Sequence, residues 1–293
     1  MKVSTVILPH ERWHRARPTW ERAEQLGFHA AYTYDHLSWR SFRGGPWFEA
    51  VTTLAAASVV TSTIRLGTLV TSPNFRHPVP LARQLLGLDD LSGGRLVVGI
   101  GSGGTGSDAG ALGGPVWSTR ERSERFAEFA ERLDQLLTRD ETTEAGRFYP
   151  AHEVVRRPAP VASPRPPFVV SALGPKAMAV AAAVGQGWVT IGALPGSGSA
   201  TTEAAVAAQA RLLDEALSAR GRLPGSIERV FLDGFTEERP LASVDAFVDL
   251  AGRFGRLGFT ELVVHWPIPD SPFECDPGLF DRIATDGVAQ LDG

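Results

Sequence analysis

One stretch, Thr63–Gly104, constrains the fold more than any other part of the chain. It opens with Ile64–Val70, an apolar run with β-branched residues that suits a strand buried on both faces. Prolines then interrupt the chain, and leucines at three- to four-residue spacing predict a helix that ends at Gly93. The apolar run Leu96–Ile100 follows and leads into a glycine-rich loop. The stretch therefore predicts two parallel strands joined by a helix, with both strand exits at one edge of a sheet.

The same alternation of strands and helices extends over the whole chain of 293 residues. We expect strands at Val3–Leu8, Phe28–Tyr34, Ile64–Val70, Leu96–Ile100, Phe168–Ser171, Trp188–Ile191, Ile227–Leu232 and Glu261–His265. We expect helices at Arg17–Gln25, Phe48–Val60, Leu81–Leu91, from Ser118 to about Leu137, Pro175–Val184, Thr201–Arg220, Ser243–Leu257 and Pro277–Leu291. This order predicts an α/β fold, a single (β/α)8 TIM barrel domain over residues 1–293, with an irregular insertion at about 138–166.

A doubly wound open sheet is the alternative architecture. Such a sheet normally places a phosphate-binding glycine turn after its first strand, whereas this chain has Pro9-His10-Glu11 there. A barrel gathers its functional side chains at the carboxyl ends of the strands. The polar residues expected there are Asp35, His36, Asn74, Arg76 and His265.

The composition favours a small molecule as the partner. The net charge of −4 offers no basic surface for nucleic acid or an anionic membrane. The N-terminus enters a strand, and no apolar run approaches the roughly 18 residues of a membrane span, so we expect a cytoplasmic protein. The lone Cys275 has no cysteine to pair with, and we expect no metal site.

Asp35 and His36 follow the second expected strand. A histidine at a strand exit can serve as a general acid or base, because its pKa lies near neutrality. A capping or hydrogen-bonding histidine is the competing interpretation. The pair could also ligate a metal, but no second pair of histidines or carboxylates has ligand spacing.

Two loops have the character of phosphate sites. The loop that follows the fourth expected strand, Gly101–Gly106, is built from small residues that let backbone amides approach an anion, and it lacks a Walker lysine. A flexible lid is its other interpretation. The loop that follows the fifth expected strand opens a helix at Pro175. The residues that we expect to hold the tail of a phosphate-bearing cofactor are Gly101, Ser102, Gly103, Gly104, Ser171, Ala172, Leu173, Gly174 and Lys176.

Several segments together resemble the bacterial luciferase-like superfamily, which contains flavin monooxygenases and deazaflavin (F420) dependent dehydrogenases and reductases. The segments are AEQLGFHAAYTYDH, TSTIRLGTLVTSPNFRHPVPLARQ, LDDLSGGRLVVGIGSG and SALGPKAMAVAAAVGQGW. The resemblance implies a barrel that holds a tricyclic flavin or deazaflavin ring at its carboxyl-terminal mouth. It also implies an oxidoreductase, small-molecule substrates and a homodimer.

The resemblance assigns roles to particular residues. His36 matches the position that faces the reactive side of the ring, with Asp35 beside it, and Trp39 matches an aromatic next to the substrate. A non-prolyl cis peptide at Leu69–Val70, followed by Thr71, would support the ring. The Asp35–His36 pair and Trp39 favour F420 as the cofactor, and FMN is the alternative, with which oxygen activation and monooxygenation become possible.

Gly104 departs from the family pattern. The F420-dependent sugar-phosphate dehydrogenases that this chain resembles have a glutamate there as proton donor. A non-catalytic flavin-binding protein is therefore an alternative function, and an unrelated barrel lyase or hydrolase that uses His36 and Asp35 is another. Substrate choice would lie in loops 37–47, 101–117 and 192–200, whose sequences do not name a molecule.

Overall fold

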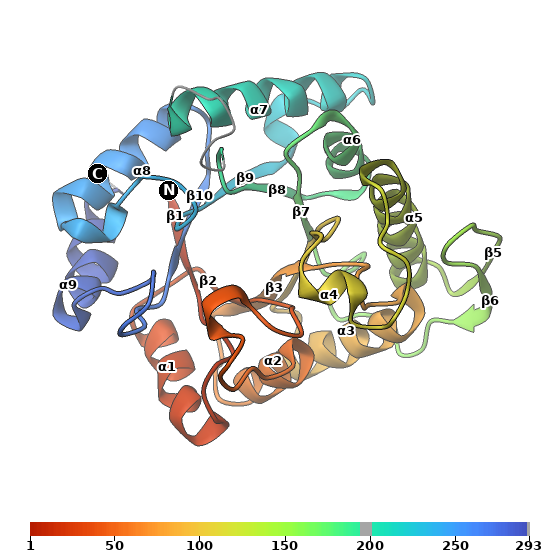
Figure 1. Ribbon diagram of the computed structural model, residues 1–293, viewed down its shortest axis with the longest axis horizontal. Coiled ribbons are helices and arrows are strands. Elements are labelled where there is room, and N and C mark those ends of the chain that lie inside the picture. Colours follow the sequence, from red (N-terminus) through yellow and green to blue (C-terminus); the bar gives the residue numbers. More distant parts are fainter. Residues whose placement is uncertain (194–200, 292–293) are drawn as a thin grey trace.

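Parallel strands close into a barrel in the computed structural model, which describes residues 1–193 and 201–291. Residues 194–200 and 292–293 lie outside the described residues, and with them most of the expected loop 192–200. The strands follow one another around the barrel in the order β1, β10, β9, β8, β7, β4, β3 and β2 (Figure 1). Their bounds are Lys2–Val6 (β1), Ala30–Thr33 (β2), Arg65–Thr71 (β3), Leu96–Ile100 (β4), Phe168–Ser171 (β7), Gly187–Thr190 (β8), Glu228–Leu232 (β9) and Glu261–His265 (β10).

The pairing of the first barrel strand with the last closes the sheet. β1 and β10 run parallel with Thr5 opposite Val264, and β1 also pairs with β2. An open doubly wound sheet would leave both outer strands unpaired on one side, so that alternative is wrong. The expected (β/α)8 barrel is confirmed.

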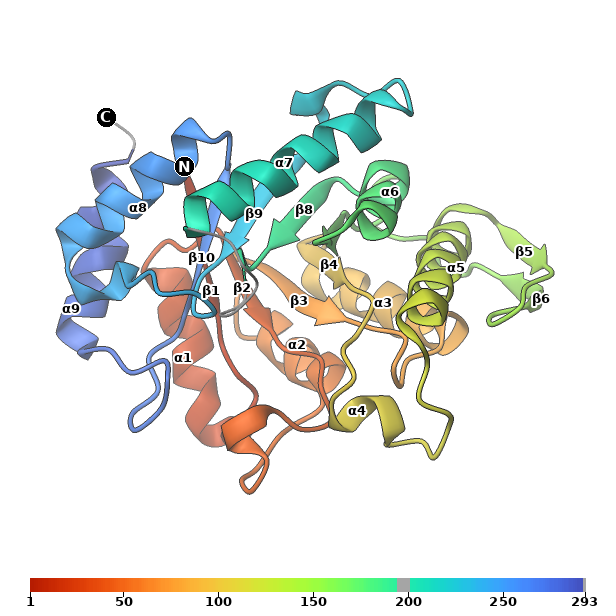
Figure 2. The same ribbon diagram turned by 45° about the horizontal axis from the view of Figure 1, so that its top comes forward.

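Helices surround the barrel and cover its outer face (Figures 1 and 2). Their bounds are Trp13–Gln25 (α1), Ala50–Ser58 (α2), Pro78–Ser92 (α3), Ser107–Gly110 (α4), Thr119–Thr138 (α5), Pro175–Val184 (α6), Thr202–Ser218 (α7), Val244–Arg256 (α8) and Pro277–Arg282 (α9). Alternate strand residues serve two cores. Ile100 and Val170 face the helices, whereas Val97 and Val169 fill the barrel interior.

The expected strands and helices agree with the structure to within a few residues at most ends. Leu96–Ile100, Phe168–Ser171, Pro175–Val184 and Glu261–His265 coincide with the observed elements. α1 begins earlier than expected, at Trp13 instead of Arg17, and accommodates Pro18 in its first two turns. The last expected helix continues from α9 as a π-helical turn, Ile283–Gly287.

Two local signals in the sequence are confirmed as helix caps. Gly93 adopts a left-handed φ of 64° at the end of α3, a conformation that residues with a Cβ atom avoid. Ser118 and Glu121 form a reciprocal capping box at the start of α5. These side chains satisfy backbone N–H groups that would otherwise lack partners.

The capping box leads to a stability prediction. Ser118→Ala should lower the free energy of unfolding by about 1 kcal/mol, because it removes the acceptor of the Glu121 N–H group. Urea denaturation would measure the change. The matched control is Ser123→Ala on the same helix, whose hydroxyl only donates to the Thr119 carbonyl, and it should be nearly neutral. Equal losses in both variants would contradict the prediction.

Two segments that we expected to be irregular contain regular structure. Within 138–166, Glu141–Glu144 (β5) and Ala151–Val155 (β6) form an antiparallel hairpin that lies beyond α5, outside the barrel (Figure 1). Their alternating polar residues gave too weak a strand signal. The expected loop 101–117 contains the short helix α4, which is important for the site. Among the described residues, no helix is long and apolar enough to cross a membrane.

Candidate functional site

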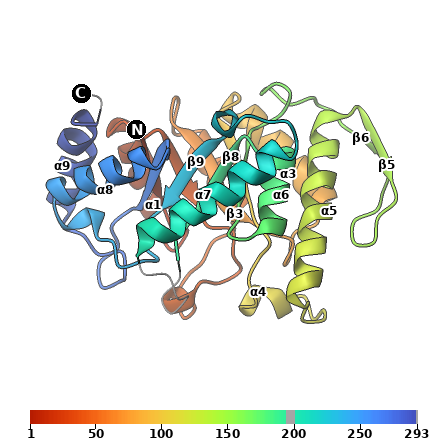
Figure 3. The same cartoon turned by 90° about the horizontal axis from the view of Figure 1, so that it is seen from above.

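The carboxyl ends of β2, β3, β4 and β7 lie next to one another at one mouth of the barrel. The loops that follow β2 and β4 meet there, and α4 lies beyond the strand ends (Figure 3). A cavity of about 420 Å³ opens between these loops. It is lined by His36, Ser38, Trp39, Arg40, Arg43, Asn74, Gly104, Gly106, Ser107 and Asp108. Parts of the expected substrate loops 37–47 and 101–117 therefore line one cavity.

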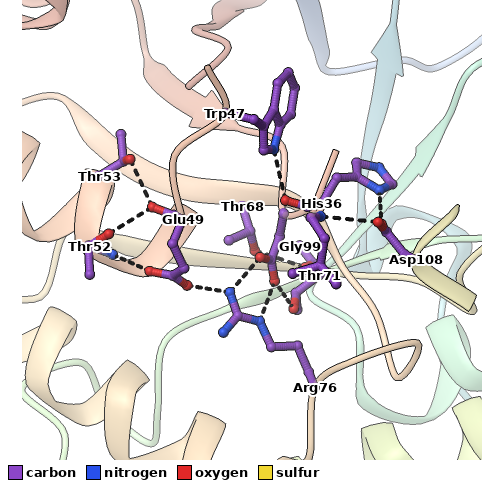
Figure 4. Close-up of polar contacts among 12 residues, drawn as sticks. His36, Trp47, Glu49, Thr52, Thr53, Thr68, Thr71, Arg76, Gly99 and Asp108 are labelled. Carbon is purple, nitrogen blue, oxygen red and sulfur yellow. Dashed lines mark hydrogen bonds and ion pairs between the residues drawn. The ribbon is translucent and has the colours of Figure 1, made fainter. Parts of the chain in front are cut away.

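His36 is held at this cavity by a carboxylate from α4. Its Nδ1 lies 2.5 Å from Oδ2 of Asp108, and Oδ1 of Asp108 accepts the Leu37 N–H group (Figure 4). A carboxylate only accepts hydrogen bonds, so this contact places a proton on Nδ1. Among the described residues, Nε2 of His36 has no hydrogen-bond partner. His36 can therefore exchange a proton through Nε2 with a molecule in the cavity.

Asp108 is a candidate site residue that our sequence reasoning missed. It lies four residues after Gly104, the position at which this chain lacks the glutamate of the F420-dependent sugar-phosphate dehydrogenases that it resembles. Its side chain is buried. A serine and an acid that follow a glycine run are a helix-start signal, which could have indicated α4. The contact with His36 spans 72 residues, and no local pattern predicts it.

Aromatic rings form one wall of the cavity. The Trp39 ring lies 4.6 Å from the His36 ring and 5.0 Å from Tyr34, between ring centroids. The Arg40 guanidinium covers Trp39 at 4.6 Å. Trp47 does not serve as a wall of this cavity; its indole N–H donates to the His36 carbonyl and fixes the backbone at that residue (Figure 4).

Asp35 lies in a buried ion pair. Only 2% of the residue is exposed, and Arg76 donates to both carboxylate oxygens, at 2.9 Å to Oδ2 and 2.5 Å to Oδ1. The Thr71 hydroxyl donates to Oδ2, and Arg76 also contacts Glu49, the N-cap of α2 (Figure 4). The Asp35–Arg76 pair therefore connects β2 with α2 and with the loop that follows β3. Asp35 itself does not line the cavity, whereas its neighbour His36 does.

Three of the expected cofactor-binding segments meet at one place. The Leu69–Val70 peptide is cis, as the resemblance implied. A Cβ atom added to Gly101 would lie 2.6 Å from Cγ2 of Val70 and 3.3 Å from Cβ of Ser171. Because only glycine allows this close approach, the ends of β3, β4 and β7 pack directly against one another at Gly101.

The glycine loop presents open backbone amides. The Gly101 N–H group donates to the Thr71 carbonyl, while the carbonyls of Gly103 and Gly104 accept from Arg122 and Asn74. Among the described residues, the N–H groups of Ser102, Gly103 and Gly104 have no acceptor. Free amides beside occupied carbonyls suit an anion such as a phosphate, so this loop fits the tail of a cofactor.

The neighbouring loop after β7 adds the N-terminus of α6. Pro175 occupies the first position of that helix, and Gly174 is its N-cap. Ala172 is buried and its N–H group donates to Val189, whereas Leu173 and Lys176 are exposed. Leu173, Gly174 and Lys176 are therefore accessible to a ligand, and Ala172 contributes packing. Among the described residues, no cluster of metal-ligating side chains occurs. Asp35 contacts Arg76, whereas its neighbour His36 contacts Asp108.

A family model described as luciferase-like monooxygenase matches residues 1–233 of this chain. That match covers the barrel strands from β1 to β9 and every residue of the cavity described above. The chain belongs to the luciferase-like monooxygenase family.

Its relatives in this luciferase-like family include F420-dependent enzymes and monooxygenases. The F420-dependent glucose-6-phosphate dehydrogenase of Intrasporangium calvum is 36% identical over 154 residues, which is 51% of this chain and 46% of that protein. The crystal structure of monooxygenase RslO1 from Streptomyces bottropensis is 27% identical, with a TM-score of 0.66 over 88% of this chain and 78% of that one. The chain spans about half the length of the curated relatives it matches.

A third comparison bears on the fold alone. The coenzyme F420 dependent tetrahydromethanopterin reductase of Methanopyrus kandleri is 18% identical, with a TM-score of 0.77 over 99% of both chains. The same barrel fold thus extends over nearly the whole of both chains.

A second group of buried polar residues lies at the ends of β9 and β10 in this luciferase-like barrel. The Tyr34 hydroxyl lies 2.6 Å from Nε2 of His265, and burial raises the pKa of Tyr34. Burial also lowers the pKa of His265 to about 3, although a hydrogen bond to the Asp233 backbone opposes this. His265 is therefore neutral at pH 7 and acts as a hydrogen-bonding partner of Tyr34.

Asp233 leads to a prediction about pH dependence. Burial raises its pKa to about 7 from 3.8, with Glu238 adding to the rise and the Gly234 N–H group and Arg239 opposing it. The native state thus binds a proton that the unfolded state releases, and this stabilisation is lost as pH rises from about 4 to 7. Relative to Asp233→Asn, the wild type should lose about 2–4 kcal/mol between pH 4 and pH 8.

Urea denaturation of both proteins across this pH range measures the difference. The neutral His265 changes stability in the same pH range, but it is common to both proteins and cancels. A difference between wild type and variant that stays constant with pH would contradict the prediction.

Proposed function

We propose that this chain is an oxidoreductase that uses F420, with FMN as the alternative cofactor, on a small organic substrate. The observation that carries the proposal is His36, which is oriented by Asp108 and leaves Nε2 facing the 420 Å³ cavity. The family membership and the F420-dependent relatives support it.

The residues of the chain have separate tasks in this proposal. The bound cofactor supplies the group that accepts or donates a hydride. Nε2 of His36 accepts the proton that the substrate loses with that hydride, or returns it in the reverse direction. Asp108 keeps the proton on Nδ1, and Trp39 covers the substrate and excludes water. Asp35 acts as a positioning residue through Arg76 and Thr71.

The ends of β3, β4 and β7 that meet at Gly101 form the proposed cofactor site. Leu69, Val70 and the Thr71 backbone would contact the ring, and the amides of Ser102, Gly103 and Gly104 would hold the phosphate with Gly101 allowing close approach. Ser171, Leu173, Gly174 and Lys176 would border the tail, with Ala172 beneath them. Although Gly104 supplies no acid, Asp108 places a carboxylate beside the histidine.

Titration of the purified chain with oxidised and reduced F420 and FMN tests the cofactor assignment. We expect saturable binding of F420 at micromolar concentration and weaker binding of FMN, followed by fluorescence and calorimetry. Failure to bind either compound would overturn the proposal.

Gly103 offers a matched test of the glycine loop. It has a left-handed φ of 71°, and an added Cβ atom would lie 2.6 Å from Oδ1 of Asn74. Gly103→Ala should weaken F420 binding roughly tenfold, because a residue with a Cβ atom pays about 1–2 kcal/mol in this conformation. Gly114→Ala in the same connection, where nothing lies within 4 Å, should leave the dissociation constant unchanged. Equal affinities of the two variants would contradict the phosphate site.

The likeness to monooxygenase RslO1 supports a second reaction for the same site. With reduced FMN and molecular oxygen as co-substrates, one oxygen atom would enter the substrate and the other would leave as water. Dependence of turnover on oxygen separates this reaction from hydride transfer with F420. A flavin-binding protein without catalysis is the alternative from another class, and the first prediction in the Discussion addresses it.

The location and assembly of the protein are also part of the proposal. A single unpaired cysteine, Cys275, suits the reducing cytoplasm. The family resemblance supports a homodimer, and light scattering coupled to size-exclusion chromatography would check it. A monomer at micromolar concentration would overturn that part alone.

A further inference from the structure

A second cavity, of about 380 Å³, lies at the carboxyl ends of β9 and β10. It is lined by Asp233, Gly234, Thr236, Glu238, Arg239, Pro240, Leu241, Ala242, His265, Pro272, Phe273 and Glu274. It shares no lining residue with the His36 cavity. Phe235 lies between them, with its ring centroid 6.4 Å from Trp39 and 6.0 Å from His265. The two cavities are therefore separate binding volumes.

A buried carboxylate residue, Asp233, belongs to the lining of this second cavity. Asp233 is 7% exposed, and its Oδ1 has no hydrogen-bond partner among the described residues. A buried polar atom without a partner is costly, and native structures nearly always provide one. A hydrogen-bond donor that enters the cavity would satisfy this oxygen.

The charges around the cavity favour a cation. Glu238 and Glu274 are part of the lining. The Arg239 guanidinium donates to the backbone carbonyls of Thr236 and Glu238, at 3.0 and 2.8 Å, and so bends back onto its own loop. His265 is neutral and bonded to Tyr34. Glu238 is paired with Arg253 of α8, so Asp233 and Glu274 are the lining carboxylates without a salt-bridge partner among the described residues, against the single cation Arg239.

The remaining walls are apolar. Phe273 stacks on the His265 ring at 3.8 Å with an angle of 11° between the planes, and Leu241, Pro240 and Pro272 complete the surface. An apolar wall next to a single unsatisfied acceptor suits a molecule with a short hydrocarbon body and one donor group.

We propose that this cavity binds the protonated amine of a small organic molecule, with the ammonium group on Asp233 Oδ1 and the hydrocarbon part against Phe273 and Leu241. This site is additional to the proposed cofactor and proton-transfer site. Because no residue is shared, a ligand can occupy it without the cofactor.

The test uses the full chain without cofactor and butylammonium as the probe, with butan-1-ol and butyrate as matched neutral and anionic probes. Saturation-transfer NMR gives each dissociation constant at pH 8. We expect butylammonium to bind saturably and each comparison probe to bind at least roughly tenfold more weakly, since a charged hydrogen bond is worth more than a neutral one. Butan-1-ol that binds as well as butylammonium, or no binding of butylammonium, would overturn the proposal.

Variants locate the binding. Asp233→Asn should weaken butylammonium at least roughly tenfold, and Asp245→Asn, an exposed residue of α8, should leave it unchanged. Carbon-13 NMR of the Asp233 carboxyl group supplies a second measurement that needs no variant: butylammonium should lower its pKa and butan-1-ol should not. Equal binding to wild type and Asp233→Asn would show that the amine lies elsewhere, and an unshifted carboxyl titration would overturn the contact. Neither result depends on F420 or FMN, so this proposal and the proposed function can fail separately.

Discussion

Replacing His36 by alanine should lower turnover by about 10²–10⁴-fold while the barrel stays folded and still binds its cofactor. The variant removes the histidine whose Nδ1 is bonded to Asp108 and whose Nε2 has no partner among the side chains that the structure describes there. The loss should appear in kcat, because the proton moves in the transition state. The rate is measured as the change in cofactor oxidation state with a substrate found by screening alcohols and carbonyl compounds.

Two further variants sharpen this result. Asp108→Asn keeps the size of the side chain but can no longer accept through two charged oxygens, so we expect a smaller loss and a changed dependence of kcat on pH. His152→Ala is the matched control, because His152 is an exposed histidine of the β5–β6 hairpin. Unchanged turnover in His36→Ala with intact cofactor binding would contradict our assignment and favour another proton donor.

An absence of turnover with every substrate, combined with tight cofactor binding by the wild type, favours the flavin-binding alternative. Cofactor binding by the His36→Ala variant then tests this alternative. A protein that only binds the cofactor should bind it equally well with alanine at position 36.

Replacing Arg76 by alanine should lower the free energy of unfolding by about 3–5 kcal/mol. The variant leaves Asp35 buried without the two hydrogen bonds that compensate its charge. Although burial lowers the pKa of Arg76, hydrogen bonds and charges from Asp35 and Glu49 raise it overall, so the guanidinium remains charged in the pair. Burial raises the pKa of Glu49, but Arg76 and the first N–H groups of α2 lower it overall.

Urea denaturation measures the loss, and two comparisons interpret it. Arg120→Ala removes an exposed arginine that pairs with Glu124 on α5, and it should leave the free energy of unfolding nearly unchanged. A double variant, Asp35→Leu with Arg76→Leu, removes both charges and should lose less than Arg76→Ala alone. A double variant at least as unstable as Arg76→Ala would show that the pair does more than neutralise a buried charge.

The local elements of this barrel follow from local physics. The strand Leu96–Ile100 and the strand Glu261–His265 are short apolar runs between turn residues, and both were predicted with their observed bounds. The capping box at Ser118 depends only on residues three positions apart. Such local signals do not depend on tertiary contacts. They predict the order of strands and helices, and that order indicates a barrel.

Weakly patterned segments could not be predicted in the same way. The strands β5 and β6 carry few apolar residues, and their hairpin forms as backbone groups pair across 138–166. The helix α4 is a single turn within a glycine-rich segment, too short for any period to be visible. The hairpin and α4 both depend on the surrounding fold, so the local sequence alone does not predict them.

The sequence by itself determined the barrel, the family, and the positions of His36 and the glycine loop at the carboxyl ends of strands. Only the tertiary structure decided what those residues contact: Asp108 binds His36 across 72 residues, and Arg76 binds Asp35 across 41. It also revealed Asp233, whose Oδ1 has no hydrogen-bond partner among the described residues, in the lining of a cavity separate from the His36 site. The physical reason is that periodicity and capping act within a few residues, whereas ion pairs and cavities depend on which distant strand ends closure of the barrel brings together.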